Sequence, residues 1–509
     1  MDPNSPLPPT SNNPTMSGVT GHPDPYSGLD KLFIAGTWRE GASGESAADT
    51  NPFNQEELAT HVLADRSDVD EAYAAAARVQ PVWAATPPAE RAALMARAVR
   101  IFDERHDELV TWCQRESGGI RAKAEFEVGA ARAAAEEAAS FPYRMHGDIF
   151  PSDTPGKENR VYRQALGVIG VISPWNFAMN LSNRSVAAAL AVGNTVVLKP
   201  ASDTPITGGL LLAKIYEEAG LMEGALSVLI GRGSEIGDYF VEHPVPKFIS
   251  FTGSTAVGRG IGAKATGGAR IKRIALELGG NCPLVIRADA DVDQAVDIAI
   301  AGRFLHQGQI CMSTNRIIVD AAIADEFTRR FVERADALIC GDQMDEATDI
   351  GPIINESQFQ SLLAKIQRAL DQGATLALGG EPTGRVVPPH VFTDVDPSSD
   401  IALQESFGPL APLIVSHGEE EALAFANMSD YGLSSAVVGG DVEAATAFAL
   451  KIDAGMTHVN DMTVADEQHV PFGGEKNSGL GRFNGRWILE EMTRTHWVSV
   501  QHAPHPYPL

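Results

Sequence analysis

Cysteine is scarce in this chain of 509 residues. No two of its cysteines form a Cys-x-x-Cys pair, and there are only four of them: Cys113, Cys282, Cys311 and Cys340. A disulfide framework or a zinc site needs more cysteines at closer, regular spacing, so neither is expected. We therefore predict a cytoplasmic protein, in a reducing compartment, with no bound metal.

Positive charge is also in short supply. The chain has 40 Lys and Arg residues against 66 Asp and Glu residues, which gives a formal net charge of −26. A field of this sign repels phosphate backbones and anionic lipid unless basic residues are locally concentrated, and no such cluster occurs in the sequence. Nucleic acid is therefore not expected as a partner.

Long hydrophobic runs are absent as well. A typical apolar stretch, residues 186–198, is interrupted by Gly193, Asn194 and Thr195, and falls short of the ~18 residues that a membrane span needs. The first basic residue is Lys31, and residues 1–30 contain seven prolines. We expect residues 1–30 to be a disordered leader rather than a signal peptide, and we expect no membrane association.

The sequence does contain an alternation of short apolar runs and helical segments. A strand over residues 31–38 and an alanine-rich helical region over about 69–141 come first, and the predicted strands that follow are 168–173, 195–198, 225–229 and 248–252. A second series comprises 283–286, 316–320, 390–395, 434–438 and 458–460. Strands joined through helices form parallel sheets. We therefore predict an α/β fold with two parallel-sheet domains, separated by a cleft that suits a small-molecule site.

The segment 248–254 is a candidate phosphate site. It reads as a strand, a glycine turn at Gly253 and a helix start at Ser254, which would leave backbone N–H groups free at the positive end of a helix. An ordinary serine N-cap explains the same pattern. Lys199 ends another predicted strand, at the sheet edge where α/β folds bind ligands, although a solvated loop lysine would look the same.

Two residues are candidates for covalent chemistry. Cys311 follows a glycine break between a helix and a strand, so its thiol is placed to face the cleft as a nucleophile. Glu277 lies between leucines and glycines, where burial would raise its pKa and suit it to act as a general base. The alternatives are an inert buried thiol and a salt-bridged structural acid.

Seven motifs together resemble those of the aldehyde dehydrogenase superfamily, in the family's order and over about residues 31–501. They are Pro174-Trp175-Asn176-Phe177, Lys199-Pro200-Ala201-Ser202, Phe251-Thr252-Gly253-Ser254, Leu276-Glu277-Leu278-Gly279-Gly280, Gly308-Gln309-Ile310-Cys311, Glu405-Ser406-Phe407-Gly408-Pro409 and Pro471-Phe472-Gly473-Gly474. The resemblance implies three parts: a Rossmann-like NAD(P)-binding domain (31–145 and 165–278), a catalytic domain (279–480), and a β oligomerisation arm with the C-terminal tail (146–164 and 481–509).

The resemblance also implies the reaction and its residues. Cys311 would be the nucleophile, Glu277 the general base and Asn176 an oxyanion donor, and an aldehyde would be oxidised to the acid through a thiohemiacetal and a thioester on Cys311. The implied cofactor contacts are Ser173, Pro174, Trp175, Lys199, Ser202, Gly233, Phe251, Gly253, Ser254, Val257, Leu278, Gly279, Glu405 and Phe407.

Further details resemble the benzaldehyde, vanillin and salicylaldehyde dehydrogenase branch. They lie in segments 181–185, 306–312 and 481–487, and they favour an aromatic aldehyde as substrate. The residues expected to line its pocket are Phe177, Leu181, Arg184, Ile310, Met312 and Phe472. Arg184 has two interpretations, a bond to a ring substituent or a structural ion pair.

The chain departs from many relatives at two positions of a second proton relay. Where those relatives carry Glu and Lys, this sequence has Phe483 and Ser185. Deacylation should therefore rest on Glu277 alone. The alternatives for the whole chain are a semialdehyde dehydrogenase in which Arg184 grips a substrate carboxylate, a thiol hydrolase, and a catalytically silent structural member.

Cofactor choice and assembly complete the expectations. NAD-specific relatives commonly carry Glu where this chain has the short, neutral Ser202, so we predict that NAD and NADP are both used. Asp203 would either restore discrimination against NADP or cap the helix after Pro205, and we favour the cap.

Residues 495–501 read as a strand with no local partner. We expect this strand to pair with another subunit of a homodimer or homotetramer, the alternative being a strand folded back on its own chain.

Overall fold

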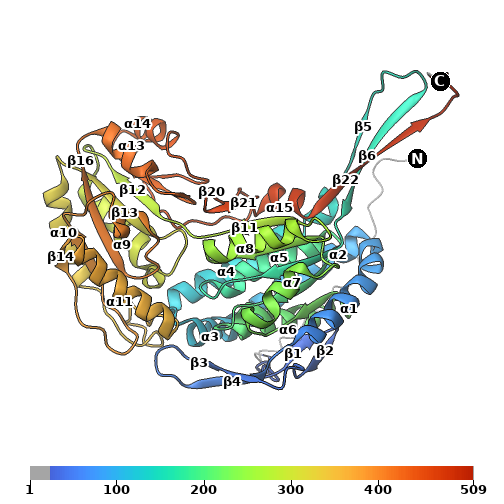
Figure 1. Cartoon of the computed structure of the whole chain (residues 1–509), viewed down its shortest axis with the longest axis horizontal. Coiled ribbons are helices and arrows are strands. Elements are labelled where there is room, and N and C mark those ends of the chain that lie inside the picture. Colours follow the sequence, from blue (N-terminus) through green and yellow to red (C-terminus); the bar gives the residue numbers. More distant parts are fainter. Residues whose placement is uncertain (1–22, 508–509) are drawn as a thin grey trace, which may run out of the picture.

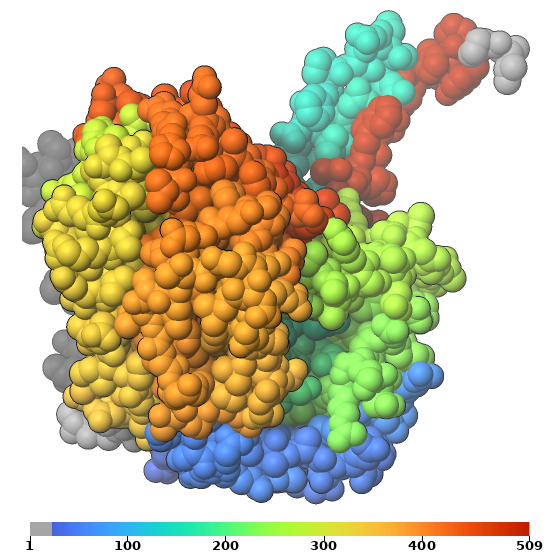
Figure 2. Space-filling view, turned by 60° about the vertical axis from the view of Figure 1, so that its left-hand side comes forward, coloured from blue at the N-terminus to red at the C-terminus, as the bar shows by residue number. Residues whose placement is uncertain are grey.

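The computed structural model describes residues 23–507. It has two α/β bodies, each built on one sheet, and a narrow β arm that projects from them (Figure 1). The arm stands clear of both bodies in the space-filling view (Figure 2). Among residues 23–507, no helix is long and apolar enough to cross a membrane.

The first body is formed by an eight-stranded sheet. Its five central strands are parallel, β1 and β21 pair antiparallel with them, and β2 pairs antiparallel with β1. The order is β2 (Thr37–Arg39), β1 (Leu32–Ile34), β9 (Leu226–Val228), β8 (Thr195–Lys199), β7 (Val168–Ile172), β10 (Phe248–Thr252), β11 (Arg273–Glu277) and β21 (Gly479–Leu480). This confirms the predicted strands of the first series. Residues 31–38 were predicted as a strand with a turn at Gly36, and they form the hairpin β1–β2 with its turn at Ala35-Gly36.

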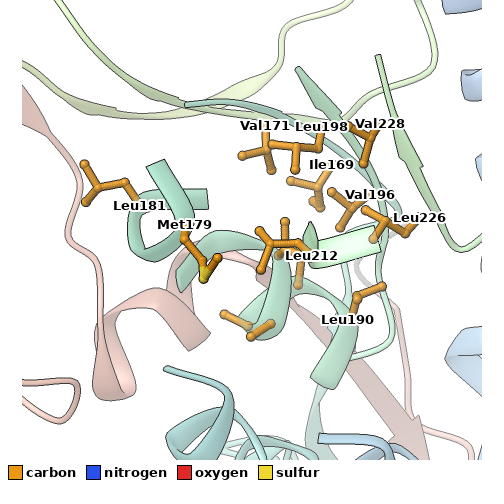
Figure 3. Close-up of a cluster of buried hydrophobic side chains, with 14 of the residues drawn as sticks. Ile169, Val171, Met179, Leu181, Leu190, Val196, Leu198, Leu212, Leu226 and Val228 are labelled. Atoms are coloured by element: carbon orange, nitrogen blue, oxygen red, sulfur yellow. The ribbon is translucent and has the colours of Figure 1, made fainter. Parts of the chain in front are cut away.

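Helices cover this sheet and bury its apolar side chains. They are α1 (Arg66–Ala85), α2 (Pro88–Glu104), α3 (His106–Ser117), α4 (Arg121–Ala138), α5 (Ala178–Ala191), α6 (Leu211–Glu218), α7 (Asp238–Glu242) and α8 (Thr255–Gly267). Strand residues such as Ile169 and Val196 are fully buried, as expected for parallel strands covered on both faces, and Figure 3 shows them packed near Leu190 and Leu212. The predicted helical region 69–141 is divided into four helices by Pro87-Pro88, Arg105 and Gly118-Gly119.

The second body has a seven-stranded sheet that is parallel except at one edge. Its order is β14 (Thr375–Leu378), β15 (His390–Thr393), β16 (Leu410–Ser416), β13 (Thr314–Asp320), β12 (Cys282–Ile286), β18 (Ala436–Val438) and β19 (His458–Val459). The helices of this body are α9 (Val292–Phe304), α10 (Ala324–Asp336), α11 (Glu356–Asp371), α12 (Asp400–Leu403), α13 (Glu419–Asn427) and α14 (Val442–Ala449). The sequence prediction missed β16. This interior strand contains Pro412, a residue that argues against a central strand.

The arm is a three-stranded antiparallel sheet with the order β22 (Thr493–Gln501), β6 (Lys157–Ala165) and β5 (Asp148–Phe150). The tail strand has no local partner, as expected, but it pairs within its own chain, which was the alternative to pairing with another subunit. β22 pairs with β6 along its whole length, from Thr493 opposite Ala165 to Gln501 opposite Lys157. The partner strand lies more than 300 positions earlier in the chain, so no short turn in the sequence indicates the pairing. Before the arm, α15 (Gly485–Glu491) packs against α5 of the first body.

Two additional strand pairs are present outside the three larger sheets, β3 (Ser46–Thr50) with β4 (Glu57–Val62), and β17 (Tyr431–Gly432) with β20 (Glu475–Lys476).

The predicted leader is described only in part, because residues 1–22 lie outside the described residues. Residues 23–30 form no helix or strand, yet Leu29 is buried and the Arg105 guanidinium lies 3.6 Å from the centre of the Tyr26 ring. These residues therefore pack on the first body, which corrects the leader prediction for 23–30.

Candidate active site

The candidate site is a cavity of about 180 Å³ where the two bodies meet. Strands β7, β10 and β11 end at it, and segment 278–281 crosses there to β12 of the second sheet. Its lining residues are Pro174, Trp175, Asn176, Leu181, Thr252, Gly253, Ser254, Glu277, Leu278, Gly279, Cys311, Gln358, Lys365, Glu405 and Phe407. The carboxyl ends of parallel strands are where α/β folds bind ligands.

Cys311 lies in this cavity on a tightly constrained loop. The three residues His306, Gln307 and Gly308 have φ angles of 49°, 56° and 71°, a left-handed run that is costly for the two non-glycine residues. The Gln307 side chain anchors the turn by donating to the carbonyls of Gly118 and Pro352, both at 2.9 Å. Burial, together with the neighbouring Glu277 carboxylate, raises the pKa of the Cys311 thiol well above its usual range. The resting thiol is therefore protonated and needs a base.

Glu277 supplies that base at the end of β11. Its side chain is buried, and burial raises its pKa to about 6. The Arg184 guanidinium, whose Nη2 lies 3.6 Å from Glu277 Oε2, opposes this rise. A carboxyl group with a pKa of about 6 accepts a proton near neutral pH and remains basic enough to activate water.

Asn176 lies in the loop between β7 and α5, two residues before α5 begins. Its side-chain Nδ2 donates to the Gln309 carbonyl at 3.0 Å, on the loop that carries Cys311. An amide nitrogen has two hydrogens, so one is left for another acceptor. The Asn176 side chain and the Cys311 backbone N–H are therefore suited to bind an oxyanion formed beside the thiol.

Two features at and beside the cavity suit the phosphates of a dinucleotide, and they come from Ser254 in the lining and Lys199 outside it. Ser254 is the N-cap of α8 but makes no side-chain capping bond, so the first N–H groups of this 13-residue helix are available to a phosphate. The Lys199 ammonium is buried, and its one hydrogen bond among the described residues is a long one of 3.5 Å to Pro200 O. Burial lowers the pKa of Lys199 to about 8. A polar ligand at this position would restore its hydrogen bonds.

Glu405 and Phe407 approach from the second body. The Gly280 N–H donates to Glu405 Oε1 at 2.9 Å, and burial raises the pKa of Glu405 to about 7. A Cβ atom on Gly279 would lie 2.8 Å from Glu405 Oε2, so glycine is needed for this close approach. The Phe407 ring meets Trp175 edge to face at 5.3 Å, and this pair forms one wall of the cavity.

Several predicted cofactor residues lie outside the cavity lining. Ser202 and Gly233 are exposed, Val257 is exposed on the first turn of α8, and Phe251 is buried. The Ser173 hydroxyl accepts a hydrogen bond from Ser182 at 2.6 Å within the first body. Lys199 also lies outside the lining, and contact between these six residues and a dinucleotide stays a prediction.

Among the predicted substrate residues, Leu181 lines the cavity and the others are buried behind it. Ile310 and Met312 flank Cys311, and Phe177 packs edge to face on His306 at 5.7 Å. Arg184 does not line the cavity. Its guanidinium lies 4.7 Å from the centre of the Phe472 ring, and it pairs with Glu277, as the ion-pair interpretation expected.

The expected cap by Asp203 is wrong. Asp203 Oδ1 accepts a hydrogen bond from Asn355 at 3.0 Å. The helical turn after Pro205 is capped instead by the buried Glu116 carboxylate, which accepts the N–H groups of Ile206 and Thr207, both at 2.7 Å. Glu116 lies in α3, far earlier in the chain, and already satisfies the donors that Asp203 was expected to cap.

Sequence reasoning missed three residues of the lining. Thr252 belongs to the motif Phe251-Thr252-Gly253-Ser254, and its place at the end of β10 was available as a signal. Gln358 and Lys365 project from α11, an amphipathic surface helix without a recognisable motif. Only the packing of the two bodies brings α11 to the cavity.

Comparison with known proteins agrees with this site. The aldehyde dehydrogenase family matches residues 38–498. The chain is 54% identical to a vanillin dehydrogenase of Corynebacterium glutamicum, over 94% of this chain and 99% of that protein.

Two solved structures are similar along most of their length. An NAD-dependent benzaldehyde dehydrogenase from Corynebacterium glutamicum is 50% identical, with a TM-score of 0.87. The match covers 93% of this chain and 97% of that protein's chain. A salicylaldehyde dehydrogenase from Pseudomonas putida G7 is 35% identical with a TM-score of 0.91, and covers 94% and 99%. The predicted α/β fold and the resemblance are confirmed, and this chain belongs to the aldehyde dehydrogenase family.

Proposed function

We propose that this aldehyde dehydrogenase oxidises an aromatic aldehyde of the benzaldehyde or vanillin type to the carboxylic acid, with NAD+ or NADP+ as oxidant. The observation that carries the proposal is the placement of Cys311, Glu277 and Asn176 at one cavity, which also has the features of a dinucleotide site. The names of the similar proteins and the apolar residues around Cys311 support an aromatic substrate.

In the proposed reaction, Glu277 accepts the proton of Cys311 and the thiolate attacks the aldehyde carbon. The Asn176 amide and the Cys311 N–H donate to the oxyanion, and each such donor typically lowers the barrier by about 2.7 to 4 kcal/mol. When bound, NAD(P)+ would be held by Lys199, the α8 N-terminus and Glu405 and would accept the hydride from the thiohemiacetal carbon, which leaves the thioester. Glu277 releases its first proton to solvent and then takes a second one from the water that attacks the thioester and displaces the Cys311 thiolate. The overall change is aldehyde, NAD(P)+ and water to carboxylate, NAD(P)H and two protons.

A panel of aldehydes tests the substrate class. Benzaldehyde, vanillin, acetaldehyde and succinic semialdehyde are compared by NAD(P)H absorbance at 340 nm. We expect the aromatic aldehydes to exceed acetaldehyde in kcat/KM by about tenfold or more, equivalent to about 1.4 kcal/mol. A preference for succinic semialdehyde would contradict the proposal. The engagement of Arg184 by Glu277 argues against that outcome, because this cation is already paired.

Dual cofactor use is part of the proposal. Ser202 is exposed and uncharged, and the nearby Asp203 is engaged by Asn355. No carboxylate at position 202 therefore opposes a 2′-phosphate. We expect kcat/KM with NADP+ to be at least about one tenth of the value with NAD+. A preference for NAD+ above a thousandfold would refute this part.

We also propose a cytoplasmic homo-oligomer, a dimer or tetramer, assembled through the arm. Within the described residues β22 is an edge strand, and the arm exposes Ile149, Phe150 and Trp497. Apolar side chains on a projecting sheet favour burial against another subunit. Truncation after Met492 removes β22 and should give monomers or aggregates by light scattering. An intact dimer or tetramer would refute the role of the arm.

A further inference from the structure

Arg303, at the last turn of α9, is a fully buried cation between two loops of the site. Its side chain is 0% exposed, and no acidic residue among 23–507 forms a salt bridge with it. Burial lowers the pKa of the guanidinium to about 9. Burying a charge without a counter-ion is expensive unless hydrogen bonds compensate, so the bonds that Arg303 makes identify its role.

Those hydrogen bonds join the loop before Cys311 to the loop that carries Glu405 and Phe407. Arg303 Nη2 donates to the Gly308 carbonyl at 3.1 Å and to the Gly408 carbonyl at 2.7 Å. We call residues 305–311 the nucleophile loop and residues 404–408 the cofactor loop. One planar guanidinium group thus fixes two segments that are about 100 positions apart in the sequence.

The glycines at the contact show how closely the loops approach. Gly308 has a φ angle of 71°, and a Cβ atom there would lie 2.5 Å from the Gly408 carbonyl oxygen. A Cβ on Gly408 would meet the Leu362 side chain at 2.3 Å. Gly308 therefore lies directly against the cofactor loop, and that loop is backed by Leu362 of α11, with Arg303 bonded to both loops at this contact.

The cofactor loop is held from a second side by Lys365. The Lys365 ammonium donates to the carbonyls of Glu405 and Ser406, both at 2.9 Å. Asn315 adds a bond from Nδ2 to the Gln404 carbonyl at 3.1 Å. Lys365 therefore contacts one loop, whereas Arg303 contacts both.

We propose that Arg303 is a positioning residue that holds the nucleophile loop and the cofactor loop together. One guanidinium group then sets both the orientation of the Cys311 thiol and the positions of Glu405 and Phe407. This inference rests on the proposed roles of Cys311 and Glu405. Loss of the guanidinium should disturb thiol reactivity and cofactor binding in the same variant. A merely structural arginine would lower the stability of the fold and leave both properties of the folded protein unchanged.

The test uses the full chain with Arg303→Lys and Arg303→Met. Arg303→Lys keeps the charge but loses the fork that reaches two carbonyls, and it serves if Arg303→Met does not fold. The matched control is Arg316→Lys. Arg316 is 2% exposed and donates to the carbonyls of Asn281 and Ala426, but to neither of the two loops.

Two measurements that need no aldehyde give the readout. One is the rate of Cys311 alkylation by iodoacetamide, resolved by peptide mass spectrometry because Cys340 is also accessible. The other is the dissociation constant of NAD+ from titration calorimetry. We expect both Arg303 variants to be alkylated about tenfold more slowly and to bind NAD+ about tenfold more weakly, since misplacement by about 1 Å is enough to cost that much. Arg316→Lys should lower Tm and leave both values within about twofold.

Lys365→Met distinguishes the loss of a contact to the cofactor loop alone from the loss of contacts to both loops. It should weaken NAD+ binding and lower the alkylation rate less than the Arg303 variants do, because Lys365 lines the cavity but holds the cofactor loop alone. The proposal is overturned if the Arg303 variants change only Tm, or change only one of the two readouts. A wild-type protein that neither binds NAD+ nor reacts at Cys311 would instead reject the proposed function.

Discussion

Replacing Arg184 by Met should shift the pH dependence of deacylation toward alkaline pH. The Arg184 guanidinium lies 3.6 Å from the Glu277 carboxylate, and both side chains are buried. With an effective dielectric constant of about 20, this pair is worth about 4 to 5 kcal/mol before desolvation is subtracted. Opposite charges at this distance typically lower the pKa of a carboxyl group by about 1 to 3 pH units.

The sign of the effect follows from the role of Glu277. Burial already raises the pKa of Glu277 to about 6, and Arg184 is the main group that opposes the rise. Other acids near Glu277, namely Asp466 and Glu405, raise its pKa or have theirs raised by it. Without Arg184 the base is protonated at neutral pH, so turnover at pH 7 should fall about tenfold and recover near pH 9.

The assay is single-turnover release of benzoate from the acylated enzyme between pH 5.5 and 9.5. Arg184→Lys, which keeps the charge, is the control and should stay close to the wild-type midpoint. Ser185→Ala is a second control, since this neighbouring hydroxyl bonds Ser250 rather than Glu277. A lower rate for Arg184→Met at every pH, with an unchanged midpoint, would refute the electrostatic argument.

Three other outcomes are expected. Cys311→Ala should abolish dehydrogenase turnover and retain NAD+ binding by calorimetry, because the thiol is the nucleophile and not a cofactor ligand; residual steady-state turnover would exclude Cys311 from that role. Glu277→Gln should release one equivalent of NAD(P)H or less and then stall at the thioester, and continued turnover in stopped flow would point to another base. Ser202→Glu should raise the ratio of kcat/KM for NAD+ over NADP+ by about tenfold or more, and an unchanged ratio would show that position 202 does not face the ribose.

The central residues of the site were predictable from short local patterns. Asn176 lies in a motif that follows the predicted strand β7, whereas Glu277 ends β11, which was not predicted as a strand, and was recognised by its leucine and glycine neighbours. Cys311 follows a glycine break before β13. Local patterns determine such positions, since each is fixed by where a strand begins or ends.

Residues whose roles depend on distant partners were not predictable in the same way. Helical spacing placed Arg184 beside Leu181 on α5, but its contacts come from Phe472 and Phe483, almost 300 positions later. The tail strand β22 likewise finds β6 across a comparable interval. Nothing in a local window specifies these pairings, because they form only when the two bodies and the arm are assembled.

Local sequence patterns therefore indicate the reactive side chains of the site but not the distances between them. Cys311, Glu277 and Asn176 are each recognisable by their side chains, yet none of them sets the distance between the thiol and the cofactor loop. That distance is fixed by the buried Arg303, which donates to the carbonyls of Gly308 and Gly408, while the half-buried Lys365 holds the cofactor loop alone. A carbonyl presents the same acceptor in every residue, so sequence motifs leave such contacts unmarked. Buried arginines and lysines without acidic partners are therefore the residues to examine first when alignment of this site is altered.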